Sequence, residues 1–151
     1  MDFKNIQIED ITISDKVFNI NKDVDFYSIK YDNDKLKLLH NFTSYSGIKK
    51  NAFNKEEINL SIDEDFKNFI RKVESFVENK LDYENLEFKS VLKQYQEYPE
   101  FLKVSINKDT IYKKDIDYKN IPINCTITIT GVWTNNKNYG ISLKLNKISG
   151  K

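Results

Sequence analysis

The segment spanning residues 125–148 constrains the fold of this chain more than any other. Threonine and isoleucine alternate over residues 126–130, and polar and aliphatic residues alternate over residues 141–146. Between them lies a polar stretch, residues 134–138, that contains three asparagines. Alternation with period two is typical of a strand with one buried and one solvated face, and the polar stretch is typical of a turn. The sequence therefore predicts a β-hairpin near the C-terminus.

The solvated face of this hairpin suggests a binding surface. It carries Thr126, Thr128 and Thr130 on one strand and Ser142, Lys144 and Asn146 on the other. Trp133, the single tryptophan, lies just before the turn, and Tyr139 begins the return strand. Aromatic rings beside lysines on a sheet are suited to stacking on unpaired bases. Both rings have an alternative role, as core residues at the end of a strand.

The charged residues limit the kind of partner this chain can bind. Its formal net charge is +1, with 24 basic and 23 acidic residues, which excludes a polybasic, histone-like protein but leaves room for a local basic face. Arg71 is the single arginine. Lysine contacts phosphate as a point charge, whereas arginine reads guanine through a bidentate fork. A nucleic-acid site built from lysine would have little sequence preference, although an AT-rich genome would give a similar composition.

Cysteine and histidine are too scarce for most enzyme chemistry. Cys125 and His40 are the single residues of their types, which excludes an internal disulfide and argues against a zinc site or a histidine-dependent nucleophile. We therefore expect no enzyme activity, no metal and no cofactor. No apolar run approaches the roughly 20 residues of a membrane span, and residues 1–20 do not resemble a signal peptide. We expect an intracellular protein in a reducing compartment, with no membrane partner.

The pattern of elements predicts one domain over residues 1–151. Residues 1–24 hold short apolar clusters between charges, which indicate one or two peripheral edge strands. Residues 26–39 predict a second hairpin with its turn at residues 32–35. Residues 42–53 are polar around Phe42 and Tyr45 and predict a loop or an irregular strand.

The clearest helix signal covers residues 61–81. It begins with the capping box Ser61-Ile62-Asp63-Glu64 and continues with apolar residues at helical spacing. Further strands are predicted at residues 86–93 and 101–106, followed by a polar connection over residues 108–122. Many short strands interrupted by one helix favour a mainly β fold, specifically an OB-like β-barrel with extra strands.

Three short patterns occur in the same order as in one protein family. The hairpin combines Gly131-Val132-Trp133 with a polar turn and Tyr139-Gly140-Ile141-Ser142-Leu143-Lys144. Earlier, Tyr27-Ser28-Ile29-Lys30-Tyr31 precedes Ser46-Gly47-Ile48, and Phe88-Lys89-Ser90-Val91-Leu92-Lys93 precedes Tyr98-Pro99. Together they resemble OB-fold single-stranded DNA-binding proteins of large double-stranded DNA viruses. The family usually has a proline before its Gly-Ile, where this chain has Tyr45-Ser46.

The resemblance extends over residues 26–148 and implies a function. Proteins of this family coat single strands during DNA replication, recombination or repair, which would place a viral member in the host cytoplasm or nucleus. Many single-stranded DNA-binding proteins end in a flexible acidic tail that recruits replication proteins. Residues 146–151 are not acidic, so we do not expect that recruitment from this segment.

The candidate nucleic-acid-binding residues are lysines on polar strand faces or turns and the aromatic rings near them. Lysines would neutralise phosphates, and the rings would stack on bases. A single lysine in such a place is more often simply solvated, so the prediction depends on the set. The candidates are Lys30, Lys37, Phe42, Tyr45, Lys49, Lys50, Lys89, Lys93, Trp133, Lys137, Tyr139 and Lys144.

The expected function is sequence-nonspecific binding of single-stranded DNA without catalysis. One alternative is a protein-interaction or scaffold module on the same fold, and another is an RNA-binding protein. A groove that combines lysines and aromatic rings would favour nucleic acid. An exposed apolar patch would favour a protein partner.

Overall fold

A computed structural model describes residues 1–21 and 23–150. Two short 3₁₀ turns, Phe3–Asn5 and Ile8–Asp10, precede the first strand. The elements that follow are β1 (Ile11–Asn21), β2 (Val24–Tyr31), β3 (Leu36–Lys50), β4 (Glu56–Ser61), α1 (Glu64–Leu81), β5 (Glu87–Phe88), β6 (Leu92–Lys93), β7 (Phe101–Ser105), β8 (Pro122–Thr134) and β9 (Asn138–Gly150).

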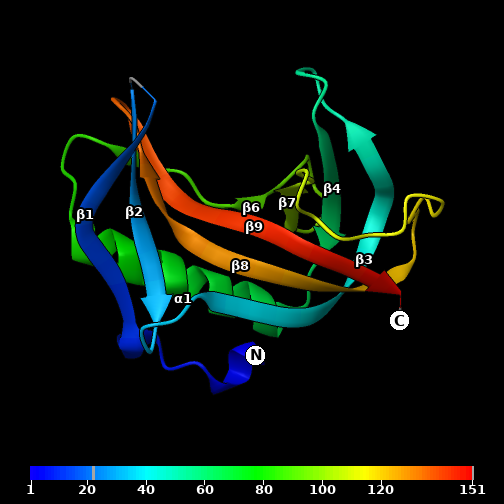
Figure 1. The fold of residues 1–151 in the computed structure, drawn as a ribbon, viewed down its shortest axis with the longest axis horizontal. Coiled ribbons are helices and arrows are strands. Elements are labelled where there is room, and N and C mark those ends of the chain that lie inside the picture. Colours follow the sequence, from blue (N-terminus) through cyan, green and yellow to red (C-terminus); the bar gives the residue numbers. More distant parts are fainter. Residues whose placement is uncertain (22, 151) are drawn as a thin grey trace.

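The strands form one sheet organised around β8. The order is β1-β2-β8-β3-β4-β7-β6, while β9 pairs with β8 and with β5. In Figure 1, β1 and β2 lie at one end, β4 and the end of β3 lie at the other, and β8 and β9 cross between them. The expected mainly β fold with one helix is confirmed. The closed barrel that was part of this expectation is not observed among the described residues, since the main path of the sheet ends at β1 and β6.

β8 has three partners. β9 pairs with one edge of β8, and β3 and β2 pair in succession with the other edge. β3 pairs with its first part, from Thr43↔Pro122 to Leu36↔Ile129, and β2 pairs with its last part, from Ser28↔Gly131 to Asp25↔Thr134. The change of partner occurs at a bulge: Ile129 and Gly131 pair with consecutive residues of β9, which leaves Thr130 as the additional residue.

The early hairpin differs from the expectation. Asp32 and Asn33 have φ values of 50° and 63° and form a two-residue turn, closed by hydrogen bonds of 2.8 and 3.0 Å between Tyr31 and Asp34. Beyond this bridge β2 and β3 have no ladder in the described part of the chain, because each takes β8 as its partner. The prediction of a continuous hairpin over residues 26–39 is wrong, although its turn is present.

The helix expected over residues 61–81 is present and covers the inner face of the sheet. Its N-cap is Asp63, whose Oδ1 accepts a 2.7 Å hydrogen bond from the Phe66 amide, rather than Ser61, which ends β4. α1 lies behind the strands in Figure 1. No helix in residues 1–21 and 23–150 is long and apolar enough to cross a membrane. The buried stripe of α1 consists of Phe66, Phe69, Ile70, Val73 and Val77, and the residues of β8 in the same core are Ile123, Cys125, Ile127, Ile129 and Val132.

The N-terminal residues contribute to this core, which their expected peripheral position did not indicate. The side chains of Phe3, Ile6 and Ile11 are buried. The Phe3 ring packs edge-on against Phe66, with ring centroids 5.3 Å apart. β1 itself is an edge strand of the sheet, as expected.

A buried carboxylate divides the strand expected over residues 86–93. Glu74 of α1 is 4% exposed; its Oε1 accepts a 2.7 Å hydrogen bond from the Ser90 hydroxyl, and its Oε2 accepts a 3.0 Å bond from the Val91 amide. Because this segment bonds to the helix, two short strands form in place of one, β5 before it and β6 after it. Burial raises the pKa of Glu74, and the two hydrogen bonds oppose that effect.

The raised pKa of Glu74 predicts a loss of stability as the pH rises. Above the ordinary value of 4.5 the unfolded chain releases this proton first, so the free energy of unfolding falls until the pH passes the pKa of the folded state. Glu74→Gln should remove this part of the pH dependence in urea unfolding between about pH 4 and pH 7. Glu84→Gln, which changes an exposed carboxylate after α1, is the control. Parallel profiles for Glu74→Gln and the wild type would contradict the prediction.

Candidate nucleic-acid interface

The outer face of the sheet, opposite α1, carries the polar residues of four neighbouring strands. On β2 the side chains alternate: Ile29 and Tyr31 are buried, while Lys30 is exposed. The same alternation on β3 buries Leu36 and Leu38 and exposes Lys37. Across β3, β8 and β9, the register aligns Lys37 with Thr128 and Thr128 with Lys144. Residues from separate parts of the sequence therefore meet on one surface.

Four lysines line a hollow of about 270 Å³ in this face, here called the lysine hollow. Lys144 Nζ lies 3.8 Å from Asp109 Oδ2, a partly exposed ion pair that offsets one of the four positive charges. A cluster of positive charges on a surface attracts anions. The residues of the lysine hollow are Ser28, Ile29, Lys30, Lys35, Lys37, Thr128, Thr130, Lys144 and Asn146.

Two aromatic rings, Phe26 and Trp133, here called the aromatic pair, lie near the lysine hollow. Phe26 is two residues from Ser28 of the hollow, on the same side of β2. Phe26 and Trp133 are partners in the β2–β8 register, so their side chains lie on the same face as neighbours. Both are half-buried, and neither belongs to the hydrophobic core or to the partly buried residues packed against it. The pair is therefore an apolar surface at the edge of the outer face.

Two glycines make room for the aromatic pair and its neighbours. A Cβ atom on Gly131 would lie 2.5 Å from Cζ of Phe26 and 2.2 Å from the carbonyl oxygen of Tyr27. A Cβ on Gly140, the β9 partner of Trp133, would lie 3.3 Å from Trp133 Cζ2 and 2.5 Å from the Lys89 carbonyl oxygen. Lys144 is four positions beyond Gly140 on β9, which corresponds to about 13 Å along the strand.

The structure brings together four of the predicted residues and places others around them. Lys30, Lys37 and Lys144 meet in the lysine hollow, and Trp133 belongs to the aromatic pair. Lys137 is exposed in the turn between β8 and β9. Lys89 follows β5, donates its amide to the carbonyl of Tyr139 on β9, and forms a 3.3 Å ion pair with Glu87.

The remaining predicted lysines lie elsewhere on the sheet. Lys49 and Lys50 end β3 opposite two acidic residues of β4, Glu57 and Glu56. Lys93 lies on β6 opposite Phe101 of β7. Tyr45 is exposed and contacts Phe101 edge-on, with ring centroids 6.1 Å apart.

Two predicted stacking residues are buried, and their assignment as stacking residues was wrong. Phe42 belongs to β3, not to a loop, and its 4% exposed side chain packs edge-on against Phe66 and His40. Tyr139 is 4% exposed and packs against Tyr83 and Phe88. Both point to the inner face because they share the alternation of the buried residues in their strands. The irregular-strand alternative for residues 42–53 holds up to Lys50, with a bulge between Ser44 and Ile48.

Sequence reasoning missed two residues of this surface for which a signal existed. Phe26 alternates with Tyr27 and shares its side of β2 with Lys30, so the period of two already placed it on the solvated face. Lys35 precedes Lys37 by two residues, which would place both side chains on the same face. Because Lys35 lies in the turn before β3, the strand alternation does not determine where its side chain points.

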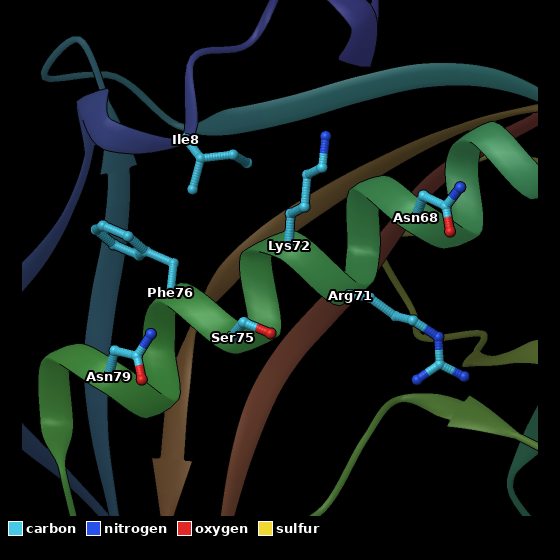
Figure 2. Close-up of a pocket in the computed structure, with 7 residues that line it drawn as sticks. All are labelled: Ile8, Asn68, Arg71, Lys72, Ser75, Phe76 and Asn79. Atoms are coloured by element: carbon cyan, nitrogen blue, oxygen red, sulfur yellow. The ribbon is translucent and has the colours of Figure 1, made fainter.

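Other features of the molecule are less suited to an anionic ligand. A hollow of about 600 Å³ along α1 is lined by two asparagines, and its two cations, Arg71 and Lys72, extend in different directions (Figure 2). Arg71 is also paired with Glu100.

Burial raises the pKa of the Cys125 thiol to about 12, so the thiol stays protonated at neutral pH. Within the described ranges, no group of three or more His, Cys, Asp or Glu could hold a metal ion.

Comparison with known proteins gives no relative. No protein-family model, no curated protein and no solved structure matches the chain.

Phe42 and Tyr45 should respond differently to substitution, because one ring is buried and the other is exposed. Phe42→Ala should lower the free energy of unfolding by about 3–5 kcal/mol, because it leaves a cavity among packed rings. Tyr45→Ala should change it by less than about 1 kcal/mol, since that ring is on the surface. Urea unfolding followed by circular dichroism measures both values. A loss of less than about 1 kcal/mol in Phe42→Ala would show that the assignment of Phe42 to the core is incorrect.

Proposed function

We propose that this protein binds single-stranded DNA without sequence specificity, through the outer face of its sheet. The observation that carries the proposal is that the lysine hollow and the aromatic pair lie on the same face of the sheet, with Ser28 of the hollow two residues from Phe26 on β2. Lysines that attract phosphates beside rings that stack on bases form the combination used by sequence-tolerant single-strand binders. Such a protein would coat exposed strands in DNA replication, recombination or repair, as the sequence resemblance to viral proteins suggests.

The aromatic pair favours a single strand over a duplex. In a duplex the faces of the bases are stacked on one another, so a protein ring reaches them only after unstacking. In a single strand the faces are accessible, and each base–ring contact contributes roughly 1–3 kcal/mol. The lysines alone would attract both forms.

Two other ligands are alternatives to single-stranded DNA: single-stranded RNA and a protein partner. RNA offers the same phosphates and accessible bases, so a single-stranded RNA is the nearest competitor for this surface. A protein-interaction module would be expected to use an apolar patch, whereas the centre of this face is lined by four lysines. Replication proteins could still bind other surfaces of the chain.

The lysine hollow predicts strong salt dependence. Binding of a fluorescent oligo-dT strand, followed by anisotropy, should weaken with a slope of log K against log salt of about −3 for four neutralised phosphates, and a duplex of equal length should bind less tightly. An oligo-U strand compares RNA in the same assay. Affinity that does not change with salt would contradict the role of the lysines.

Charge reversal in the lysine hollow tests the location of the site. Lys30→Glu/Lys37→Glu should lower the affinity for oligo-dT at least tenfold and leave the melting temperature nearly unchanged, because both side chains are exposed. Lys72→Glu/Lys80→Glu on α1 changes the net charge equally on the opposite side of the sheet and should have a much smaller effect. Equal losses in both variants would indicate a response to net charge and not a site.

Loss of either ring of the aromatic pair should weaken binding. Phe26→Ala and Trp133→Ala should each cost roughly 1–3 kcal/mol in the oligo-dT titration, with less effect on the unfolding free energy than Phe42→Ala. If Trp133→Ala lowers stability as much as Phe42→Ala while affinity is retained, Trp133 is a structural residue and the aromatic pair is not a stacking site.

A further inference from the structure

Two tyrosines form an exposed stacked pair in the connection between β6 and β7. Tyr95 and Tyr98 are each 62% exposed, and their rings lie nearly parallel, at 13°, with centroids 6.3 Å apart. The connection is held by hydrogen bonds from the Tyr98 amide to the Tyr95 carbonyl and from the Gln94 side chain to the Tyr98 carbonyl, of 3.1 and 3.2 Å. Aromatic rings that are already held in one arrangement lose little conformational freedom when a flat ligand stacks on them.

This tyrosine pair lies beside a row of outer-face residues. The register aligns Thr43 of β3 with Ser61 of β4, Ser61 with Phe101 of β7, and Phe101 with Lys93 of β6. Lys93 ends β6 and lies two residues before Tyr95. The row therefore leads from β3 directly to the tyrosine pair.

β3 connects this row to the lysine hollow. Lys37 lies in the hollow, and the outer side chains that follow it along the strand, Leu39, Asn41 and Thr43, are exposed. Thr43 is six positions beyond Lys37, which corresponds to about 20 Å of strand. The outer face of β3 is thus a continuous exposed track between two places where aromatic rings lie next to lysine.

We propose that the Tyr95–Tyr98 pair is a second stacking site for the same nucleic-acid strand that occupies the lysine hollow. This inference rests on the proposed function. A strand that begins at the aromatic pair and crosses the lysine hollow reaches the tyrosine pair by following β3, with Lys93 available for a phosphate at that end. Short strands fill only the first site, and longer strands fill both, so the affinity increases with length in two stages.

The experiment compares two strand lengths in the oligo-dT assay. A strand of about 5 nucleotides covers one site, and a strand of about 16 nucleotides is at the upper end of the length bound by one small domain. Tyr95→Ala/Tyr98→Ala should weaken binding of the long strand at least tenfold and leave the short strand unchanged. Tyr95→Phe/Tyr98→Phe keeps both rings and should restore long-strand affinity.

An exposed aromatic ring at another turn of the sheet provides the control. Phe53→Ala removes an 83% exposed ring at the β3–β4 turn and should not alter either affinity. Unchanged long-strand affinity in Tyr95→Ala/Tyr98→Ala, with Lys30→Glu/Lys37→Glu still defective, overturns the second site and leaves the proposed function intact. Equal loss with both strand lengths also overturns it, because the tyrosines would then belong to the first site. Absence of binding to any strand by the wild type overturns both proposals.

A second measurement does not depend on the folding of a variant. Long and short strands that carry a photoreactive thymine analogue are crosslinked to the wild-type protein, and the modified residues are identified by mass spectrometry. Crosslinks to Tyr95 or Tyr98 with the long strand alone support the proposal. Crosslinks of the long strand confined to the aromatic pair and the lysine hollow overturn it.

Discussion

The structure depends on the close approach of β2 to β8 at Gly131. Most of β8 pairs with β3, and its last residues pair with β2. The change from one partner to the other occurs at the bulge at Thr130. At Gly131 a Cβ atom would come within 2.2 Å of the β2 backbone. Only a residue without a side chain permits this contact, so the pairing of β2 with β8, and of β1 with β2 beyond it, requires glycine at that position.

The same bulge determines which side chains reach the outer face. Before it, the odd-numbered residues of β8, such as Ile129, point to the core. The additional Thr130 shifts the alternation by one, so Val132 and Thr134 are buried and Trp133 lies on the outer face beside Phe26. The candidate stacking residue and the candidate phosphate-binding lysines lie on one surface because of this shift.

The sequence predicts an element and the direction of its side chains where local periodicity determines them. It does not predict them where contacts with residues distant in the sequence determine them. Alternation predicted the C-terminal hairpin and the outward lysines of β2 and β3, and helical spacing predicted α1. Applied strictly, alternation would also have placed Tyr139 in the core. The position of Trp133 could not be predicted, because the bulge is not visible in the sequence pattern. The break at Ser90 could not be predicted either, since it depends on hydrogen bonds to Glu74, sixteen residues earlier.

The distribution of cations explains why the proposed binding would not distinguish sequences. The lysine hollow presents four compact charges, and ammonium groups attract phosphates without reading the edges of bases. Arg71, the one side chain able to form a bidentate fork with guanine, lies on α1 and is paired with Glu100. The lysine hollow would then not discriminate between bases. The rings would stack on any base, because every base has a flat face. The selectivity left to such a surface is for unpaired over paired strands.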